Sequence, residues 1–365
     1  MAVPKPKSGP PRADDMARWD ALRRVAIVGA ATLKGKELKD VLEERKFPAM
    51  DVRLLDDDES LGQLDAVGDE ATFIQSVQPE QFEHVDFTFF ASEAPFTASH
   101  WKMARDAGSV VIDMSYALED EPGAAIRSPW VERELGRTAH ANSNIVLVAH
   151  PASIVLAMLL ARAQKAAALK SAVSVIFEPA SEQGRRGMDE LHQQTVNLLS
   201  FQELPKAVFD AQVAFNLLGR YGSESARSLE SVEKRVLRHL AEITRGESSG
   251  QPARLPVPSL MLLQGPTFHS HALSVYIELE NAVSAGDFAQ ALAGEHVRLA
   301  RLSEDAPTNV AAAGQNDILV AVRRDPQRAA GWWLWAAADN LKISALTAAE
   351  CAETSTAPPP KTRIQ

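Results

Sequence analysis

One serine stands where the sequence predicts the N-terminus of a buried helix. Residues 144–148 read Asn-Ile-Val-Leu-Val and predict a buried strand. Pro151 should end that strand, because proline donates no ladder hydrogen bond and restricts His150 before it. Residues 154–169 are then predicted to form a largely buried helix. Free N–H groups at its start could hold an oxyanion while Ser153 attacks a carbonyl, although a simple capping role for Ser153 is the alternative.

A second cluster of polar side chains contains His269 and His271. On a strand these two residues would share a face and could ligate a metal. The sequence shows no third ligand for them, so we predict hydrogen-bonded histidines and no metal site.

A glycine turn follows the first predicted strand, residues 25–28, and precedes a predicted helix at residues 36–45. Gly29 would make the tight turn, and Gly35 would allow close packing of helix on strand, as in a dinucleotide fingerprint. Thr32 stands where the middle glycine would let a pyrophosphate approach the backbone. An ordinary turn from strand to helix in a parallel sheet is the alternative.

Four acidic residues, from Asp56 to Glu59, follow the second predicted strand at residues 52–55. An acid at this place can bind a ribose 2′-hydroxyl, and several acids would repel a 2′-phosphate. NAD is therefore the expected cofactor in preference to NADP, with a solvated acidic loop as the alternative.

The remaining pattern predicts two α/β parts. In the first, strands at 85–91 and 109–113 flank a helix at 95–107, which indicates a parallel sheet, and residues 122–142 are expected to be loops with a short helix. The second lacks regular alternation, which favours a mixed or antiparallel sheet. Its predicted strands are residues 172–177, 260–263, 274–280, 318–322 and 331–337, the last carrying three tryptophans, and its helices are residues 186–199, 224–244 and 339–353.

Composition narrows the class of protein. The chain has 365 residues, enough for about two domains, and a net charge of −10, which argues against nucleic acid as a partner. Cys351 is the single cysteine, so no intramolecular disulfide forms. The longest apolar run, residues 154–161, is too short to span a membrane. Residues 1–20 and 354–365 are expected to be disordered tails, and the protein is expected to be cytoplasmic.

Several motifs occur together in one order along the chain. They are residues 29–35, residues 111–115, Ser181 with residues 184–191, Phe215-Asn216, His271 and residues 339–341. This pattern resembles the aspartate-semialdehyde dehydrogenase family over residues 25–353.

The resemblance implies a Rossmann-type NAD(P)-binding domain at residues 21–150, to which a last helix at 339–353 returns. It implies an α/β dimerisation domain at residues 151–338, and hence a homodimer with a small-molecule ligand. It also implies cofactor contacts at Gly29, Ala31, Thr32, Gly35, Asp56, Ser92 and Asn340.

The family attacks an aldehyde with a cysteine thiolate, assisted by a histidine, a glutamine and an arginine that grips the substrate. Here Ser153 stands at the cysteine position and Glu178 at the glutamine position, whereas His269 replaces the arginine. His271 alone is kept. A serine hydroxyl needs an adjacent base to attack, and the missing arginine removes a bidentate carboxylate partner.

With these departures the sequence pattern is closer to the USG-1 branch of the family, which also lacks the cysteine. They predict a homologue that has lost phosphate-dependent aldehyde oxidation and has a binding or regulatory role. An active oxidoreductase on another aldehyde or acyl phosphate is the alternative. A serine hydrolase using Ser153 and His271 is disfavoured, because no Gly-x-Ser-x-Gly elbow exists.

Overall fold

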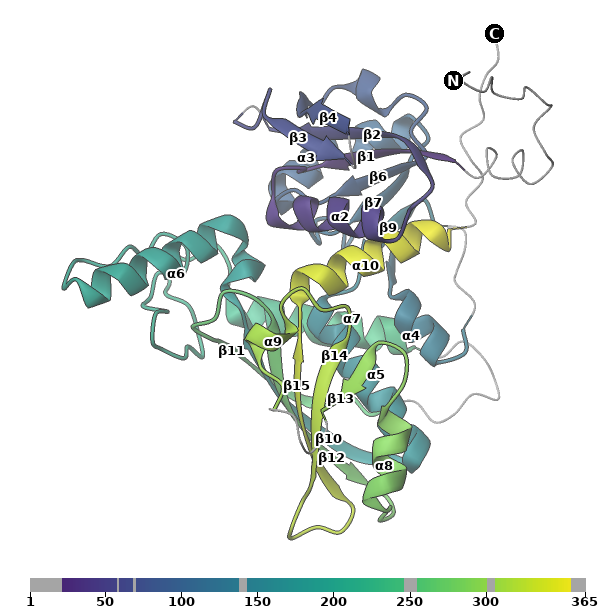
Figure 1. Cartoon of the computed structure of the whole chain (residues 1–365), viewed down its shortest axis with the longest axis vertical. Coiled ribbons are helices and arrows are strands. Elements are labelled where there is room, and N and C mark those ends of the chain that lie inside the picture. Colours follow the sequence, from purple (N-terminus) through teal and green to yellow (C-terminus); the bar gives the residue numbers. More distant parts are fainter. Residues whose placement is uncertain are drawn as a thin grey trace, which may run out of the picture.

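Two β-sheets form the body of the molecule, and the last helix, α10 (Asn340–Glu353), runs between them (Figure 1). The computed structural model describes residues 22–57, 59–67, 70–137, 143–245, 255–300 and 306–355. The tail predicted at residues 1–20, and residues 356–365 of the other tail, lie outside these ranges. No helix within the described ranges is long and apolar enough to cross a membrane.

The first sheet is parallel and has seven strands in the order β5-β2-β1-β6-β7-β9-β8. Its central strands are buried on both faces, which explains their continuous apolar runs. The strands are β1 (Arg23–Val28), β2 (Ala49–Asp56), β5 (Gln75–Ser76), β6 (Phe87–Phe90), β7 (Val110–Asp113), β8 (Ala125–Arg127) and β9 (Ile145–Val148). Around them lie the β3 (Leu64–Val67) and β4 (Glu70–Phe73) hairpin, η1 (Pro79–Phe82), α2 (Leu33–Glu44), α3 (Ala94–Asp106) and α4 (Pro129–Glu134).

Two details of this part differ from the sequence prediction. The helix predicted at residues 36–45 begins at Leu33, because the side chain of Thr32 caps it. The segment expected to be loops with a short helix also contains β8, an edge strand of the sheet. Its three residues are too few to show the alternation of a strand.

The second sheet is mixed, as predicted, with the order β11-β10-β12-β15-β14-β13. The β10–β11 and β13–β14 pairs are parallel and the others antiparallel. Its strands are β10 (Leu169–Glu178), β11 (Ser259–Gln264), β12 (His271–Leu279), β13 (Val297–Leu299), β14 (Ile318–Arg324) and β15 (Gly331–Ala338). The helices of this part are α5 (Pro151–Ala166), η2 (Ala180–Gln183), α6 (Gly184–Leu199), α7 (Leu229–Thr244), α8 (Ala285–Leu292) and α9 (Asn309–Ala312).

The three tryptophans of β15 divide between the two faces of this sheet. Trp332 is buried and stacks on Phe288 of α8 with ring centroids 4.2 Å apart. Trp333 and Trp335 lie on the opposite face, each 37% exposed. One face therefore packs on helices, and the other presents aromatic surface.

Helix α10 connects the two parts by packing against α2. Lys342 donates to Glu44 at 2.8 Å, and Arg45 pairs with Glu353 at 2.6 Å. Cys351 is buried in the same helix, and burial raises the pKa of its thiol to about 12. The boundaries of two domains at residues 150 and 338 remain a prediction.

Candidate functional site

The N-terminus of α5 presents a histidine in place of the expected serine. His150 is the N-cap, and its Nδ1 accepts a hydrogen bond from the Ala152 N–H at 3.3 Å. Pro151 occupies the first helical position, which its fixed φ favours. The prediction that the helix begins after Ser153 is therefore wrong by three residues.

Ser153 lies inside the first turn of α5 and faces α7. It is fully buried, and its Oγ donates to the carbonyl of Val236 at 2.8 Å. A carbonyl oxygen cannot serve as a general base, so this contact gives Ser153 no activation. Ser153 does not pair with His271, as a serine hydrolase would require, because His271 is hydrogen-bonded to Glu178.

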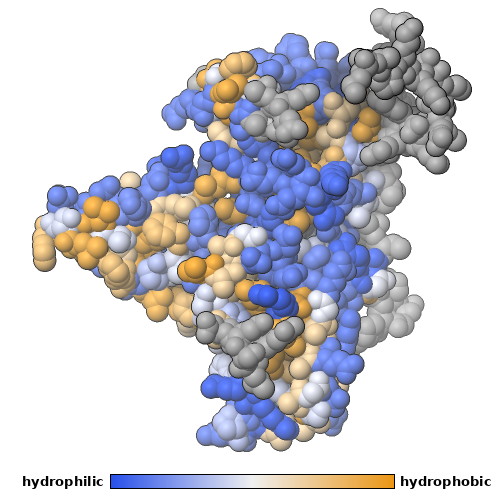
Figure 2. Space-filling view, viewed as in Figure 1, coloured by the Kyte–Doolittle hydropathy of each residue, from blue (hydrophilic) through white to orange (hydrophobic). Residues whose placement is uncertain are grey.

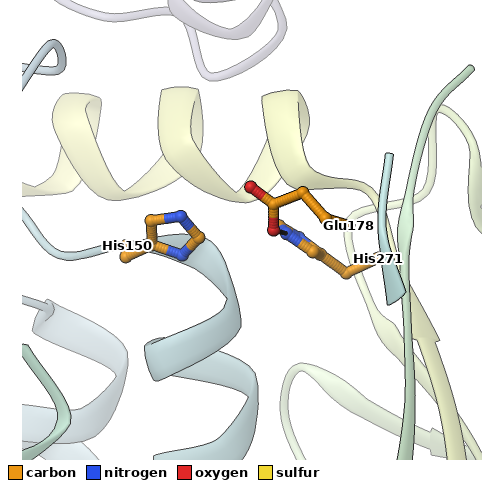
Figure 3. Close-up of side chains that lie close together, drawn as sticks. All are labelled: His150, Glu178 and His271. Atoms are coloured by element: carbon orange, nitrogen blue, oxygen red, sulfur yellow. Dashed lines mark hydrogen bonds and ion pairs between the residues drawn. The ribbon is translucent and has the colours of Figure 1, made fainter. Parts of the chain in front are cut away.

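His271 forms a buried pair with Glu178 (Figure 3). Glu178 is the last residue of β10 and His271 the first of β12, and these neighbouring strands bring their side chains together. The His271 Nε2 and Glu178 Oε2 atoms are 3.0 Å apart, and both residues are at most 1% exposed. Burial acts to lower the pKa of His271, but the hydrogen bond and charge of Glu178 outweigh it, so the pKa is raised.

His150 joins this pair to make a cluster of three possible ligand groups, which we call the His-Glu-His cluster. One side-chain N or O atom of each of His150, Glu178 and His271 lies within 4.8 Å of the others. The ring of Tyr116 stacks on His150 with centroids 5.5 Å apart, and the cation of Lys34 lies 4.6 Å from the centre of the Tyr116 ring. Burial lowers the pKa of His150 well below its usual value, which keeps the ring neutral.

A second buried carboxylate, Glu182, borders the cluster from η2. Its Oε2 lies 3.9 Å from His150 Nε2, and its Oε1 accepts from Asn340 Nδ2 at 2.8 Å. Burial acts to raise the pKa of Glu182, but attraction to His150, once that ring is protonated at low pH, and to Lys34 outweighs it and lowers the pKa to about 2.

A pocket of about 290 Å³ opens beside Glu182 and Tyr116 at the carboxyl ends of the parallel strands. Ligands bind at this edge in open parallel sheets. One part of its lining is acidic, with Asp56, Asp57 and Glu59. Another part is basic, with Lys34, Arg185, Arg186 and Arg227.

Four of the seven predicted cofactor residues line this pocket: Ala31, Thr32, Asp56 and Ser92. Gly29 and Gly35 shape the turn behind it. A Cβ on Gly29 would lie 2.4 Å from the Ser92 nitrogen, and a Cβ on Gly35 would lie 2.1 Å from the Gly29 oxygen. Asn340 is not among the pocket-lining residues; it binds Glu182 and accepts from the Ser270 N–H at 3.1 Å.

Two N–H groups of the glycine turn already donate hydrogen bonds to side chains of the same protein. Asp56 Oδ2 accepts from the Ala31 N–H at 2.7 Å, and Thr32 Oγ1 accepts from the Gly35 N–H at 3.0 Å. A bound pyrophosphate would compete with these contacts for the same donors.

His269 lies outside the His-Glu-His cluster. It is half-buried in the loop before β12, and Ser270 has a φ of +70°, so the chain is not extended there. The idea that His269 and His271 share a strand face is therefore wrong. The residues that the sequence analysis left without a role are His150, Glu182, Tyr116 and Lys34. His150 and Tyr116 each follow closely on a predicted parallel strand, and this position alone could have marked them as site residues, because ligands bind at the carboxyl ends of such strands.

A parallel nucleotide-type sheet, a ligand pocket at its carboxyl edge and a mixed second sheet define a two-part α/β dehydrogenase fold. Residues 24–143 match the NAD binding domain of semialdehyde dehydrogenase, and residues 160–343 match its dimerisation domain. The chain belongs to the semialdehyde dehydrogenase family.

Relatives of two kinds cover nearly the whole chain. A USG-1 protein homolog of Azotobacter vinelandii is 31% identical over 340 residues, which is 90% of this chain and 96% of the relative. An aspartate-semialdehyde dehydrogenase of Rickettsia bellii is 27% identical over 337 residues, which is 90% of this chain and 96% of the relative. The structure of a probable aspartate-semialdehyde dehydrogenase from Pseudomonas aeruginosa superposes with a TM-score of 0.78 at 28% identity, covering 91% of this chain and 97% of its own.

The dependence of stability on pH should change when Glu182 loses its charge. Its pKa is lowered from 4.5 to about 2, so the ionised carboxylate stabilises the fold above pH 4.5 and loses that effect as pH falls toward 2. Relative to Glu182→Gln, the wild type should lose about 3 kcal/mol of unfolding free energy across that window. Urea unfolding at several pH values measures this, with the exposed Glu203→Gln variant as the control. Parallel profiles for wild type and Glu182→Gln would contradict the assignment.

Proposed function

We propose that this protein is a homodimeric, dinucleotide-binding member of the family that does not carry out phosphate-dependent aldehyde oxidation. The observation that supports this most is the state of Ser153. Its hydroxyl is fully buried and bonded to the Val236 carbonyl, while His150 takes the place at the helix start.

The groups around the cluster also disfavour thiolate-type chemistry. Glu178 holds the Nε2 atom of His271, and its buried negative charge would oppose an oxyanion forming beside that histidine. His269 cannot replace the planar, bidentate grip of an arginine on a substrate carboxylate. We therefore propose that the site binds a small molecule or nucleotide and that the protein has a binding or regulatory role.

For the nucleotide we propose NAD in preference to NADP, bound with modest affinity. Asp56, Asp57 and Glu59 line the pocket and would repel a 2′-phosphate. The Ala31 and Gly35 N–H groups are already satisfied within the chain, which lowers the gain from binding a pyrophosphate.

An active oxidoreductase is the second candidate, because the buried His271–Glu178 pair is a possible acid–base unit close to the pocket. Turnover of aspartate semialdehyde by the wild type would favour this second candidate.

We propose that the homodimer forms through the outer face of the second sheet and the neighbouring α6. Val173 and Met261 lie on the same face as Trp333 and Trp335, and these four side chains are 37–56% exposed. Helix α6 projects from the body, and Figure 2 shows apolar surface along this projection. Exposed patches of this kind mark interfaces between proteins.

Wild-type protein should show no phosphate-dependent oxidation of aspartate semialdehyde with NAD or NADP, and Ser153→Cys alone should recover none. Groups that act as a unit are strongly non-additive, so the thiol alone restores little. A steady-state assay should also include the triple variant Ser153→Cys, Glu178→Gln, His269→Arg. Wild-type turnover near the usual median of roughly 10 per second would refute the proposal and favour the active-oxidoreductase candidate.

Calorimetry should show modest binding of NAD and weaker binding of NADP to the wild type. Thr32→Gly should raise the affinity for NAD, because it opens the approach to the backbone and frees the Gly35 N–H. Ser60, which lines the same pocket outside the glycine turn, gives a control in Ser60→Gly. Tighter binding of NADP than of NAD would overturn the choice of nucleotide.

Light scattering at micromolar concentration should report twice the chain mass of 39.6 kDa. Met261→Asp should shift the protein toward monomer, because a charge would be buried in an apolar interface. Met50 is exposed to a similar extent on β2, 54% against 56% for Met261, so Met50→Asp is the matched control and should stay dimeric. A monomeric wild type would refute the dimer, and a dimeric Met261→Asp would refute this interface.

A further inference from the structure

We propose that the His-Glu-His cluster binds one divalent transition-metal cation of the zinc type, with His150, Glu178 and His271 as the protein ligands. This goes beyond the proposed function and does not depend on nucleotide binding. It also differs from the pair of His269 and His271 considered above, because only His271 belongs to both sets.

The three ligands come from three separate elements whose ends converge. His150 caps α5, Glu178 ends β10 and His271 begins β12, and each side chain is at most 1% exposed. Two ligands of one tetrahedral zinc ion, each about 2.0–2.2 Å from it, lie roughly 3.3–3.6 Å apart. His271 Nε2 and Glu178 Oε2 are 3.0 Å apart, so a small separation of the pair reaches that distance, and the third ligand atom is within 4.8 Å. Figure 3 shows the His150 ring and a Glu178 oxygen facing the same space.

The donor set selects the kind of cation. Two imidazoles and one carboxylate are typical of zinc and of other first-row cations, whereas magnesium and calcium prefer oxygen ligands alone. A metal-binding histidine must be neutral, and burial keeps His150 in that form. Within the described residues His271 Nδ1 has no hydrogen-bond partner, so it can carry the ring proton when Nε2 binds a cation in place of its contact with Glu178.

The charges of the surroundings also fit a cation. Glu178 and Glu182 bring two buried carboxylates close together, and a buried charge is costly unless it is compensated. A divalent cation would replace the proton that His271 shares with Glu178 and would supply a second positive charge. Glu182 Oε2, 3.9 Å from His150 Nε2, and the hydroxyl of Tyr116, which has no partner among the described residues, are candidates for the fourth position.

The cluster lies next to the pocket and shares two neighbours with it. Tyr116 and Glu182 both contact His150 and both line the pocket of about 290 Å³. Binding through His150 Nε2 moves the ring proton to Nδ1 and gives up the contact with the Ala152 N–H. That contact is 3.3 Å long and hence weak.

The test uses the full chain, stripped of metal with a chelator and then titrated with zinc alone and with cobalt(II) alone. Calorimetry and native mass spectrometry should report one zinc per chain, and cobalt should give visible absorption of a site with nitrogen and oxygen ligands. Zinc should also raise the melting temperature of the wild type, because it binds the native state. Failure of the wild type to bind zinc would by itself overturn the proposal.

Two variants and one matched control locate the site. His150→Asn removes a ligand but keeps a residue that caps helices well, so the fold should persist, and Glu178→Gln removes the carboxylate. In both, zinc affinity should fall by at least about tenfold, the smallest loss typical even of outer-shell changes at metal sites. His269→Asn, two residues from His271, should bind as the wild type does. Equal zinc binding by His150→Asn and wild type, with circular dichroism showing both folded, would refute the site. Neither result depends on aldehyde oxidation or on nucleotide, so failure here leaves the proposed function standing.

Discussion

Two carboxylates, Glu178 and Glu182, are buried where the two sheets and α10 meet, and the surrounding elements are arranged to compensate their charge. Glu178 is hydrogen-bonded to His271 on the adjacent strand, and Glu182 accepts a hydrogen bond from Asn340 at the start of α10. Lys34 adds positive charge from the glycine turn. Because Asn340 and Lys34 come from distant parts of the sequence, the charge of Glu182 is compensated only when the last helix and the glycine turn are both in place. The residues at the junction of the two sheets and α10 are therefore also residues of the candidate site.

The glycine turn keeps the packing of a familiar pattern while side chains of the same protein hydrogen-bond to part of it. Gly29 and Gly35 keep the close approach of helix and strand that the pattern requires. The residues between them have changed: Thr32 caps α2, and Lys34 reaches the Met114 carbonyl at 2.7 Å and the ring of Tyr116. Such a motif would leave its N–H groups free for a phosphate. Here some of these N–H groups donate hydrogen bonds to side chains of the same protein. Backbone packing is thus retained while two N–H groups of the turn are hydrogen-bonded within the chain.

The sequence was sufficient for most regular elements and for naming Glu178 and His271 as site residues, and it was insufficient for their pairing and for the start of α5. The longer strands of both sheets have clear apolar patterns, so their existence and the mixed second sheet followed from periodicity. Strands β5, β8 and β13, of two or three residues each, are too short for such a pattern. The helix start depended on whether Pro151 ends a strand or opens a helix, and local sequence allows both. The position of Glu182 depended on a long-range bond to Asn340, which no local pattern reveals.

The shift at the start of α5 has chemical consequences because a helix turns by about 100° per residue. With Pro151 as the first helical residue, His150 lies at the end of the helix and faces Tyr116 and His271. Ser153, three residues on, faces α7 and bonds the Val236 carbonyl. Replacing the Ser153 hydroxyl with a thiol would change the group without changing the direction in which it points. The identity of residue 150 thus has more influence on the chemistry of the junction than the identity of residue 153, because His150 lies next to Tyr116, Glu182 and His271.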